Sequence, residues 1–267
     1  MADRNAEHRI DEALRSRPPG LWPFLAAGYP SIGATEAMLR RMGSLPIRGV
    51  ELGFPFSDPI ADGPVIQNAF THALAAGTRV ADIFEMVRDV RDEVAYPIVA
   101  MVSVSIVYRL GVESFVERVK SAGFDGLIVP DLALEEAPQL ATCAAAAGLR
   151  LPMFIAPTTP PERQARIAKL AGGFLYYVSV QGTTGQRAAL PVDLSDHVLQ
   201  VRSETGLPVV VGFGICTPEH VREVCGYADG AIVGSAIVKH IADALQSGGD
   251  EADVVEQVAR FVDMLCV

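Results

Sequence analysis

Two carboxylates flank a proline-rich loop, and their positions suit acid and base chemistry. Residues 48–53 form an apolar run typical of a short buried strand, yet Glu51 lies inside it. Pro64 opens the next apolar segment, which predicts a helix, and Asp62 lies on the loop between the two. An acid on a strand and an acid on the following loop can face one pocket, where one stays deprotonated while burial tunes the other. The alternative is structural: a buried glutamate satisfied by backbone amides, beside a turn rich in Asp and Pro.

Three glycine-bearing turns late in the chain have the composition of an anion site. They lie at 181–185, 212–215 and 234–235, each directly after an expected strand. Glycine lets backbone N–H groups approach an anion, and the segment after the third turn is typical of a short helix, whose N-terminus carries partial positive charge. Glycine is common wherever a strand turns into a helix, so one such turn means little, but three in these places indicate a phosphate site. Isomerases and aldolases of phosphorylated sugars would use the same arrangement.

Alternating strands and helices must position these groups. Strands are expected at 23–28, 47–53, 97–102, 125–129, 150–155, 174–178, 208–212 and 229–233. Short apolar strands that alternate with helices predict an α/β fold, a parallel (β/α)8 TIM barrel, whose chemistry lies on the loops after the carboxyl ends of the strands. An open doubly wound sheet is the runner-up. We expect one domain over 1–267, with an extra N-terminal helix at 3–16 that covers the bottom of the barrel.

Composition narrows the classes of function. The net charge of −10 argues against a broad basic face for nucleic acid or for an anionic membrane. The N-terminus is polar and no apolar run approaches roughly 18 residues, so we expect no secretory signal and no membrane span. The cysteines have no metal-like spacing and are typical of reduced thiols in a cytoplasmic protein. Histidines and lysines fall on expected helices or surface segments, which argues against a His-based catalyst, a metal site and a Schiff-base aldolase.

The run from Glu51 to Pro64 closely resembles the signature of the tryptophan synthase α subunit family. Members of that family are (β/α)8 barrels that cleave indole-3-glycerol phosphate into indole and glyceraldehyde 3-phosphate, and the resemblance covers about 23–238. It implies that Glu51 protonates indole C3 and accepts the hydroxyl proton, while Asp62 stabilises the ring N–H, without a cofactor. Tyr176 matches a tyrosine beside the catalytic glutamate, although an aromatic of the barrel interior is an equal alternative.

Further roles follow from the same resemblance, position by position. The residues that would hold the phosphate are Gly185, Gly214, Gly234 and Ser235, with Phe213 beside it. Thr184 would reach Asp62 when the loop after the sixth strand closes, and closure would exclude water. The slot for the indole ring would be formed by Phe24, Met101 and Ile128, although most residues of this type are simply core.

One segment departs from the family pattern. Where the family usually carries Tyr-x-Asn after the third strand, Ser103 and Ser105 stand in this chain. In the family that region contributes to communication with a PLP-dependent β subunit, so the serines put the coupling in an α2β2 complex in question. The resemblance also implies partner contacts by the loop from Pro55 to Asp58, since proline-rich loops dock with little loss of entropy.

Three functions therefore remain open from the sequence. The chain is an α subunit that hands indole to a β subunit, a stand-alone indole-3-glycerol phosphate lyase that releases indole for specialised metabolism, or a non-catalytic subunit that activates a β-type partner. The intact acid pair argues against the third, and the two serines slightly favour the second. Asp131, at an expected strand end, either faces the site or caps the following helix.

Overall fold

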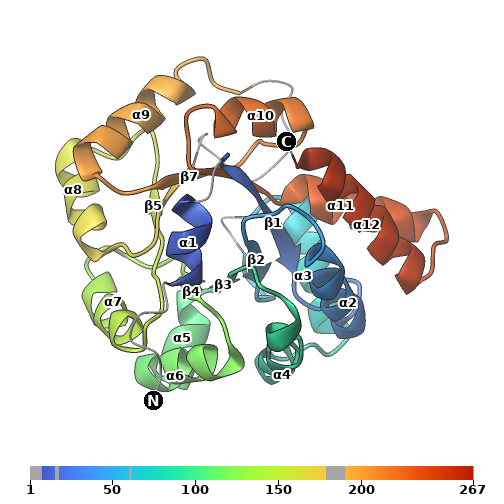
Figure 1. The fold of residues 1–267 in the computed structure, drawn as a ribbon. Coiled ribbons are helices and arrows are strands. Elements are labelled where there is room, and N and C mark those ends of the chain that lie inside the picture. The colour runs from blue at the N-terminus through green and yellow to red at the C-terminus, as the bar shows by residue number, and fades with distance from the viewer. Residues whose placement is uncertain (1–7, 16–17, 60–61, 179–189, 267) are drawn as a thin grey trace.

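A ring of parallel strands surrounded by helices forms the centre of the computed structural model (Figure 1). The structure describes residues 8–15, 18–59, 62–178 and 190–266. Within these residues the strands are β1 (Gly20–Ala26), β2 (Val50–Gly53), β3 (Ile98–Met101), β4 (Gly126–Ile128), β5 (Met153–Ile155), β6 (Leu175–Val178), β7 (Val209–Gly212) and β8 (Gly230–Val233). The helices are α1 (Arg9–Arg15), α2 (Ile32–Met42), α3 (Pro64–Ala75), α4 (Val80–Val90), the 3-10 helix η1 (Arg91–Glu93), α5 (Val104–Leu110), α6 (Val112–Ala122), α7 (Ala137–Ala146), α8 (Pro161–Leu170), α9 (Leu194–Thr205), α10 (Pro218–Cys225), α11 (Ser235–Gln246) and α12 (Glu251–Leu265).

The strands form a nearly closed barrel, which confirms the expected fold. Their order is β4-β3-β2-β1-β8-β7-β6-β5, and every paired neighbour is parallel. Arg150, just before β5, bridges to Gly126 of β4. Two backbone hydrogen bonds support this bridge, from Leu127 N to Arg150 O at 2.8 Å and from Arg150 N to Asp125 O at 3.0 Å. The two ends of the sheet therefore meet, as a barrel requires.

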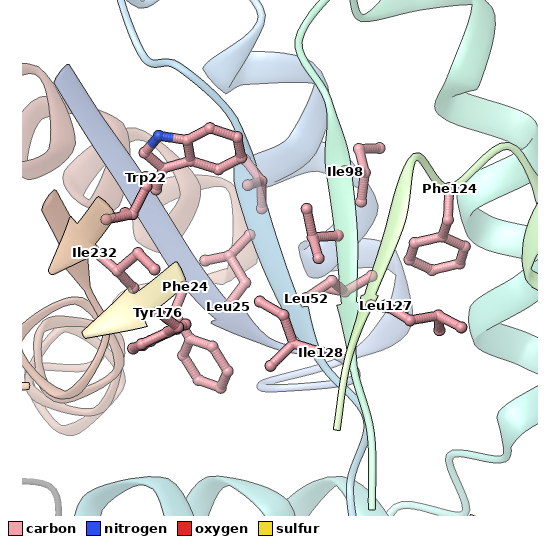
Figure 2. Close-up of a cluster of buried hydrophobic side chains, with 14 of the residues drawn as sticks. Trp22, Phe24, Leu25, Leu52, Ile98, Phe124, Leu127, Ile128, Tyr176 and Ile232 are labelled. Atoms are coloured by element: carbon pink, nitrogen blue, oxygen red, sulfur yellow. The ribbon is translucent and has the colours of Figure 1, made fainter. Parts of the chain in front are cut away.

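At the amino-terminal end of the barrel, glycines pack against one large aromatic side chain. Trp22 of β1 is buried, and its ring lies 5.6 Å from that of Phe174. A Cβ atom on Gly230 would lie 2.9 Å from the Trp22 indole nitrogen, and one on Gly49 would overlap the same ring. Glycine at both positions thus makes room for the one tryptophan of the chain. Figure 2 shows a cluster of buried hydrophobic side chains, with Trp22 at one end of it and Phe24 further along the same strand.

Helix α1 covers the amino-terminal end of the barrel, as expected for the N-terminal helix. Its Ile10 is fully buried and lies against Gly126 at the start of β4 and Gly173 just before β6. Because both glycines lie at strand beginnings, Ile10 fills the bottom of the barrel. In Figure 1, α1 lies inside the ring of outer helices. No helix among the described residues is long and apolar enough to cross a membrane.

Several elements differ from the expectation, and the second strand, for example, covers Val50–Gly53 rather than 47–53. The first strand covers Gly20–Ala26 rather than 23–28, because residues 20–23 pair with β8 and Gly28, with φ 81°, turns the chain. The fifth covers Met153–Ile155 rather than 150–155. Helix α5 was not expected, since its β-branched run has low helix propensity. It is held by a cap from Ser103 and by contacts of its first turn with Asp131.

Candidate active site

A cavity opens at the carboxyl ends of the strands. Nine of the residues expected in the site line it: Phe24, Glu51, Asp62, Met101, Tyr176, Phe213, Gly214, Gly234 and Ser235. They come from β1, β2, β3 and β6, from the loops after β2 and β7, and from the junction of β8 with α11. Phe24 and Ser235, which are 211 positions apart in the sequence, thus face one space. This is the position at which barrel enzymes carry out their chemistry.

Glu51 is a buried carboxyl group in the wall of the cavity. It lies in β2 between Phe24 of β1 and Val99 of β3, and only 2% of its surface is exposed. Desolvation by burial, followed by the nearby charge of Asp62, raises the pKa of Glu51 to about 8, while a hydrogen bond from Tyr176 opposes the rise. Within the described residues, Oε1 of Glu51 has no hydrogen-bond partner. The group is therefore a carboxylic acid at neutral pH, with one oxygen available to a ligand.

Tyr176 is the hydrogen-bond partner of the Glu51 carboxyl group. Burial raises its own pKa well above 10, so its hydroxyl stays neutral and donates to Glu51. Strand alternation places the neighbouring Tyr177 on the opposite face of β6. A Cβ atom on Gly212 of β7 would lie 2.5 Å from the Tyr176 hydroxyl, so glycine there leaves room for this contact. The arrangement gives Tyr176 a positioning role toward Glu51.

Asp62 approaches the cavity from the loop after β2. Burial raises its pKa to about 6, below that of Glu51. Its carbonyl accepts a hydrogen bond from the Gln67 side chain at 2.8 Å, and its N–H donates to Pro59 O at 3.0 Å, so the backbone there contacts both α3 and the loop. Between these two pKa values Asp62 is ionised while Glu51 is protonated. The pair can thus donate a proton at one point and stabilise positive charge at another.

The opposite end of the cavity offers backbone N–H groups. Phe213 and Gly214 both have positive φ, 73° and 80°, and a non-glycine residue in that region is strained, as is common at functional sites. Gly234 is the N-cap of α11, which has neither a side-chain cap nor an acidic residue in its first turn. Helix α11 continues to Gln246, longer than the short helix expected. Its uncapped N-terminus can bind an anion such as a phosphate.

Some of the expected residues lie elsewhere. Gly185 and Thr184, expected to hold the phosphate and to close the loop, lie outside the described residues. Ile128 is fully buried in β4 (Figure 2) and is not among the side chains that line the cavity. Of the two expected partner contacts, Pro55 is buried and Asp58 is exposed.

Asp131 and Ser103 lie together beside the site. Ser103 Oγ donates to Asp131 Oδ2 at 2.7 Å, and Val104 N donates to Oδ1 at 2.8 Å. Asp131 therefore caps α5, from the preceding βα unit, rather than the helix that follows it in sequence. Ser105 contributes its backbone N–H to the same turn, as a donor to Ser103 Oγ at 3.2 Å.

Four apolar residues in the wall were not predicted for the site. They are Ile66 of α3, Ile215 after β7, Ile232 of β8 and Ala236 of α11. Of these, Ile232 carried a usable signal: it lies two residues before Gly234, and side chains that far apart on a strand share a face. The other three resemble core residues in their type and spacing. Among the described residues, no group of three or more His, Cys, Asp or Glu side chains is placed to hold a metal ion.

Comparison of the chain with known proteins points to one family. The family model described as tryptophan synthase alpha chain matches residues 11–265. The tryptophan synthase alpha chain of Rhodopirellula baltica is 43% identical over 260 residues, which are 96% of this chain and 94% of that protein. That of Synechocystis sp. is 42% identical over 250 residues, 93% of this chain and 95% of that protein.

Solved structures give the same result. The alpha subunit from Legionella pneumophila superposes with a TM-score of 0.89 at 34% identity, covering 97% of both chains. A structure from Pyrococcus furiosus, described as addressing mutual activation of the tryptophan synthase a2b2 complex, matches with a TM-score of 0.84 at 35% identity over 92% of this chain and 97% of that one. With its carboxylate pair and its anion-binding turns at one end of such a barrel, this chain belongs to the tryptophan synthase alpha chain family.

Proposed function

We propose that this protein cleaves indole-3-glycerol phosphate by a retro-aldol reaction to indole and glyceraldehyde 3-phosphate, as the α subunit of tryptophan synthase. The observation that carries the proposal is that the buried Glu51 and Asp62 line one cavity, where burial raises the pKa of Glu51 above that of Asp62. Family membership over nearly the whole chain supports the same lyase reaction in tryptophan biosynthesis. The uncapped N-terminus of α11 supplies the place for the phosphate.

The mechanism follows from the positions of these groups. With the phosphate at Gly234 and Ser235, the indole ring occupies the end of the cavity toward Met101. Glu51 gives its proton to indole C3, and the positive charge that develops on the ring nitrogen is stabilised by the carboxylate of Asp62, which accepts the N–H. The bond between C3 and the glycerol carbon then breaks, and its electron pair returns to the ring as the hydroxyl on that carbon becomes the aldehyde. The carboxylate of Glu51 accepts the hydroxyl proton and is restored as the acid.

Substitution of Glu51 tests this proposal. Glu51→Gln keeps the shape of the side chain and its contact with Tyr176 but can neither donate nor accept the proton, so kcat for indole release should fall by roughly 10² to 10⁴. Tyr176→Phe, which keeps the carboxyl group and removes its hydrogen bond, should lose less activity and shift the pH profile. Indole release is followed with purified protein, and circular dichroism confirms that both variants are folded. Undiminished turnover by Glu51→Gln would remove Glu51 as the acid.

A β subunit as partner and a cytoplasmic location complete the proposal. Exposed residues of the loop after β2, Ser57 and Asp58, lie on the cavity side of the barrel, where a β subunit that receives indole has to dock. The Pyrococcus furiosus relative forms an a2b2 complex, which supports the same assembly here. The cysteines have no metal-like spacing in the sequence, which suits a reducing compartment.

A further inference from the structure

A second pocket lies beside the catalytic cavity. The two spaces share Asp62 and Met101 as a common wall. The far side of the second pocket is mostly apolar and aromatic, with Phe54, Phe56 and Val102 among its lining residues. The mechanism above leaves this pocket without a role.

The polar groups of the second pocket are largely satisfied by the protein. Asp131 accepts hydrogen bonds from Ser103 Oγ and Val104 N, and Asp58 accepts one from Ser57 Oγ at 2.8 Å. What the pocket offers a ligand is therefore apolar surface rather than a free charge. A small apolar group that enters the pocket would leave water and contact aromatic side chains, which favours its binding.

The orientation of the substrate decides which of its atoms face this pocket. In the mechanism proposed above, the phosphate lies toward α11, C3 lies at Glu51, and the ring N–H lies at Asp62. Asp62 lines both spaces and Glu51 lines the first alone. The edge of the benzene ring on the nitrogen side, with carbon 6 at its far corner, therefore points toward the shared wall. Carbon 4, on the C3 side, points toward the closely packed Glu51 and Tyr176. Met101 in the wall is unbranched and adapts easily to a neighbouring group.

We propose that the second pocket receives substituents on carbon 6 of the indole ring, so that 6-substituted indole-3-glycerol phosphates are substrates of this chain. The inference rests on the function proposed above and adds a substrate class to it. Ser103 keeps the pocket open, because its small side chain lies in the wall and is turned to Asp131. A tyrosine in its place would project a ring into the space.

Three substrates and two variants test the proposal: unsubstituted, 4-methyl and 6-methyl indole-3-glycerol phosphate, with wild-type protein, Ser103→Tyr and Ser103→Ala. In the wild type, kcat/KM for the 6-methyl compound should be within about threefold of the unsubstituted value, while the 4-methyl compound loses about tenfold or more, the usual effect of one misplaced methyl group. Ser103→Tyr should lower the ratio of 6-methyl to unsubstituted kcat/KM by about tenfold. Ser103→Ala loses the same hydrogen bond without adding bulk, and it should leave that ratio within about twofold of wild type.

The outcomes separate the two proposals. If the wild type turns over the unsubstituted substrate but discriminates equally against both methyl compounds, the pocket proposal fails and the lyase function stands. An equal change of the ratio in Ser103→Tyr and Ser103→Ala would also overturn it, because the effect would then come from the lost hydrogen bond. Absence of any turnover of the unsubstituted substrate, by folded protein with or without a β subunit, would overturn both.

Discussion

At the scale of single residues, the burial that makes Glu51 an acid also weakens the fold. The pKa of this carboxyl group rises from its ordinary 4.5 to about 8 because the ionised form is poorly solvated inside the barrel. Below pH 4.5 the group is neutral in both the folded and the unfolded chain, so its burial does not lower the free energy of unfolding. As the pH rises to 8 the unfolded chain gains the favourable ionised form, so the free energy of unfolding falls across this window.

Glu51→Gln should therefore stabilise the protein in a pH-dependent way. Glutamine cannot ionise, so the variant and the wild type should have similar unfolding free energies near pH 4.5, while at pH 8.5 the variant should be more stable by about 2–4 kcal/mol. Urea unfolding at several pH values measures the difference. Glu117→Gln, an exchange of the same type at an exposed position of α6, is the control and should show no such trend. A difference that stays constant from pH 4.5 to 8.5 would contradict this account.

At the scale of secondary-structure elements, a buried aspartate ties the beginnings of neighbouring strands together. Asp125, just before β4, accepts a hydrogen bond from Ile98 N, the first residue of β3, at 2.9 Å. The same oxygen, Oδ2, accepts from Arg91 Nη1 at 3.1 Å, and both side chains are less than 10% exposed. Arg91 belongs to η1, so a single carboxylate joins two strands to the segment that follows α4.

The same arrangement recurs half a barrel away. Asp229, just before β8, accepts from Val209 N, the first residue of β7, at 2.9 Å. Arg202 of α9 donates to the other oxygen of the carboxylate at 3.0 Å, but a third of the Arg202 side chain is exposed. An Asp-Gly step thus fixes both strand pairs β3–β4 and β7–β8. The two sites differ in how far the arginine is buried and in a second arginine, Arg9, that pairs with Oδ1 of Asp125 at 3.1 Å.

This difference predicts that the two equivalent substitutions lower the free energy of unfolding by unequal amounts. Asp125→Asn leaves a buried arginine without its counter-ion and should lower the free energy of unfolding by about 3–5 kcal/mol. Asp229→Asn leaves an arginine that water can reach, and it should cost about 1–2 kcal/mol. Urea unfolding at pH 7 measures both values. Because the two aspartates lie at the amino-terminal end of the barrel, kcat of the folded fraction should be retained. Equal costs would show that burial of the arginine does not decide the effect.

The same scale shows what the sequence could and could not predict. Eight strands were predictable because buried parallel strands are short, continuous apolar runs, and the alternation with helices left few other folds. The glycine turns and the carboxylate inside a strand were predictable because those residue types are unusual there. Helix α5 was not, since Asp131, distant in sequence, stabilises its first turn. Nor were Ile66 and the second pocket, because apolar wall and apolar core have the same composition. A single domain over 1–267 stays a prediction.

At the scale of the whole molecule, the two ends of the barrel have different roles. The amino-terminal end is closed by α1 and tied by Asp125 and Asp229, and the carboxyl-terminal end holds both cavities. The loop after β2 carries Asp62 into the catalytic cavity and a few residues earlier exposes Ser57 at the surface. A partner that presses on the exposed part of this loop can therefore change the position of Asp62, which couples docking to catalysis.

This coupling gives the last prediction. A β subunit should raise kcat for indole release, because docking on the loop holds Asp62 in place, and Ser57→Arg should weaken that rise by obstructing the exposed loop. Gln246→Arg introduces the same side chain at the exposed C-terminal end of α11, the opposite end of that helix from the cavity, and should leave the rise as in the wild type. Indole release is measured against β-subunit concentration for all three proteins. Ser57 lies outside both cavity linings. The effect of Ser57→Arg should therefore appear as a higher concentration of β subunit at half-maximal activation. Brisk turnover that no amount of β subunit changes would instead identify a stand-alone lyase, the alternative that Ser103 and Ser105 slightly favour.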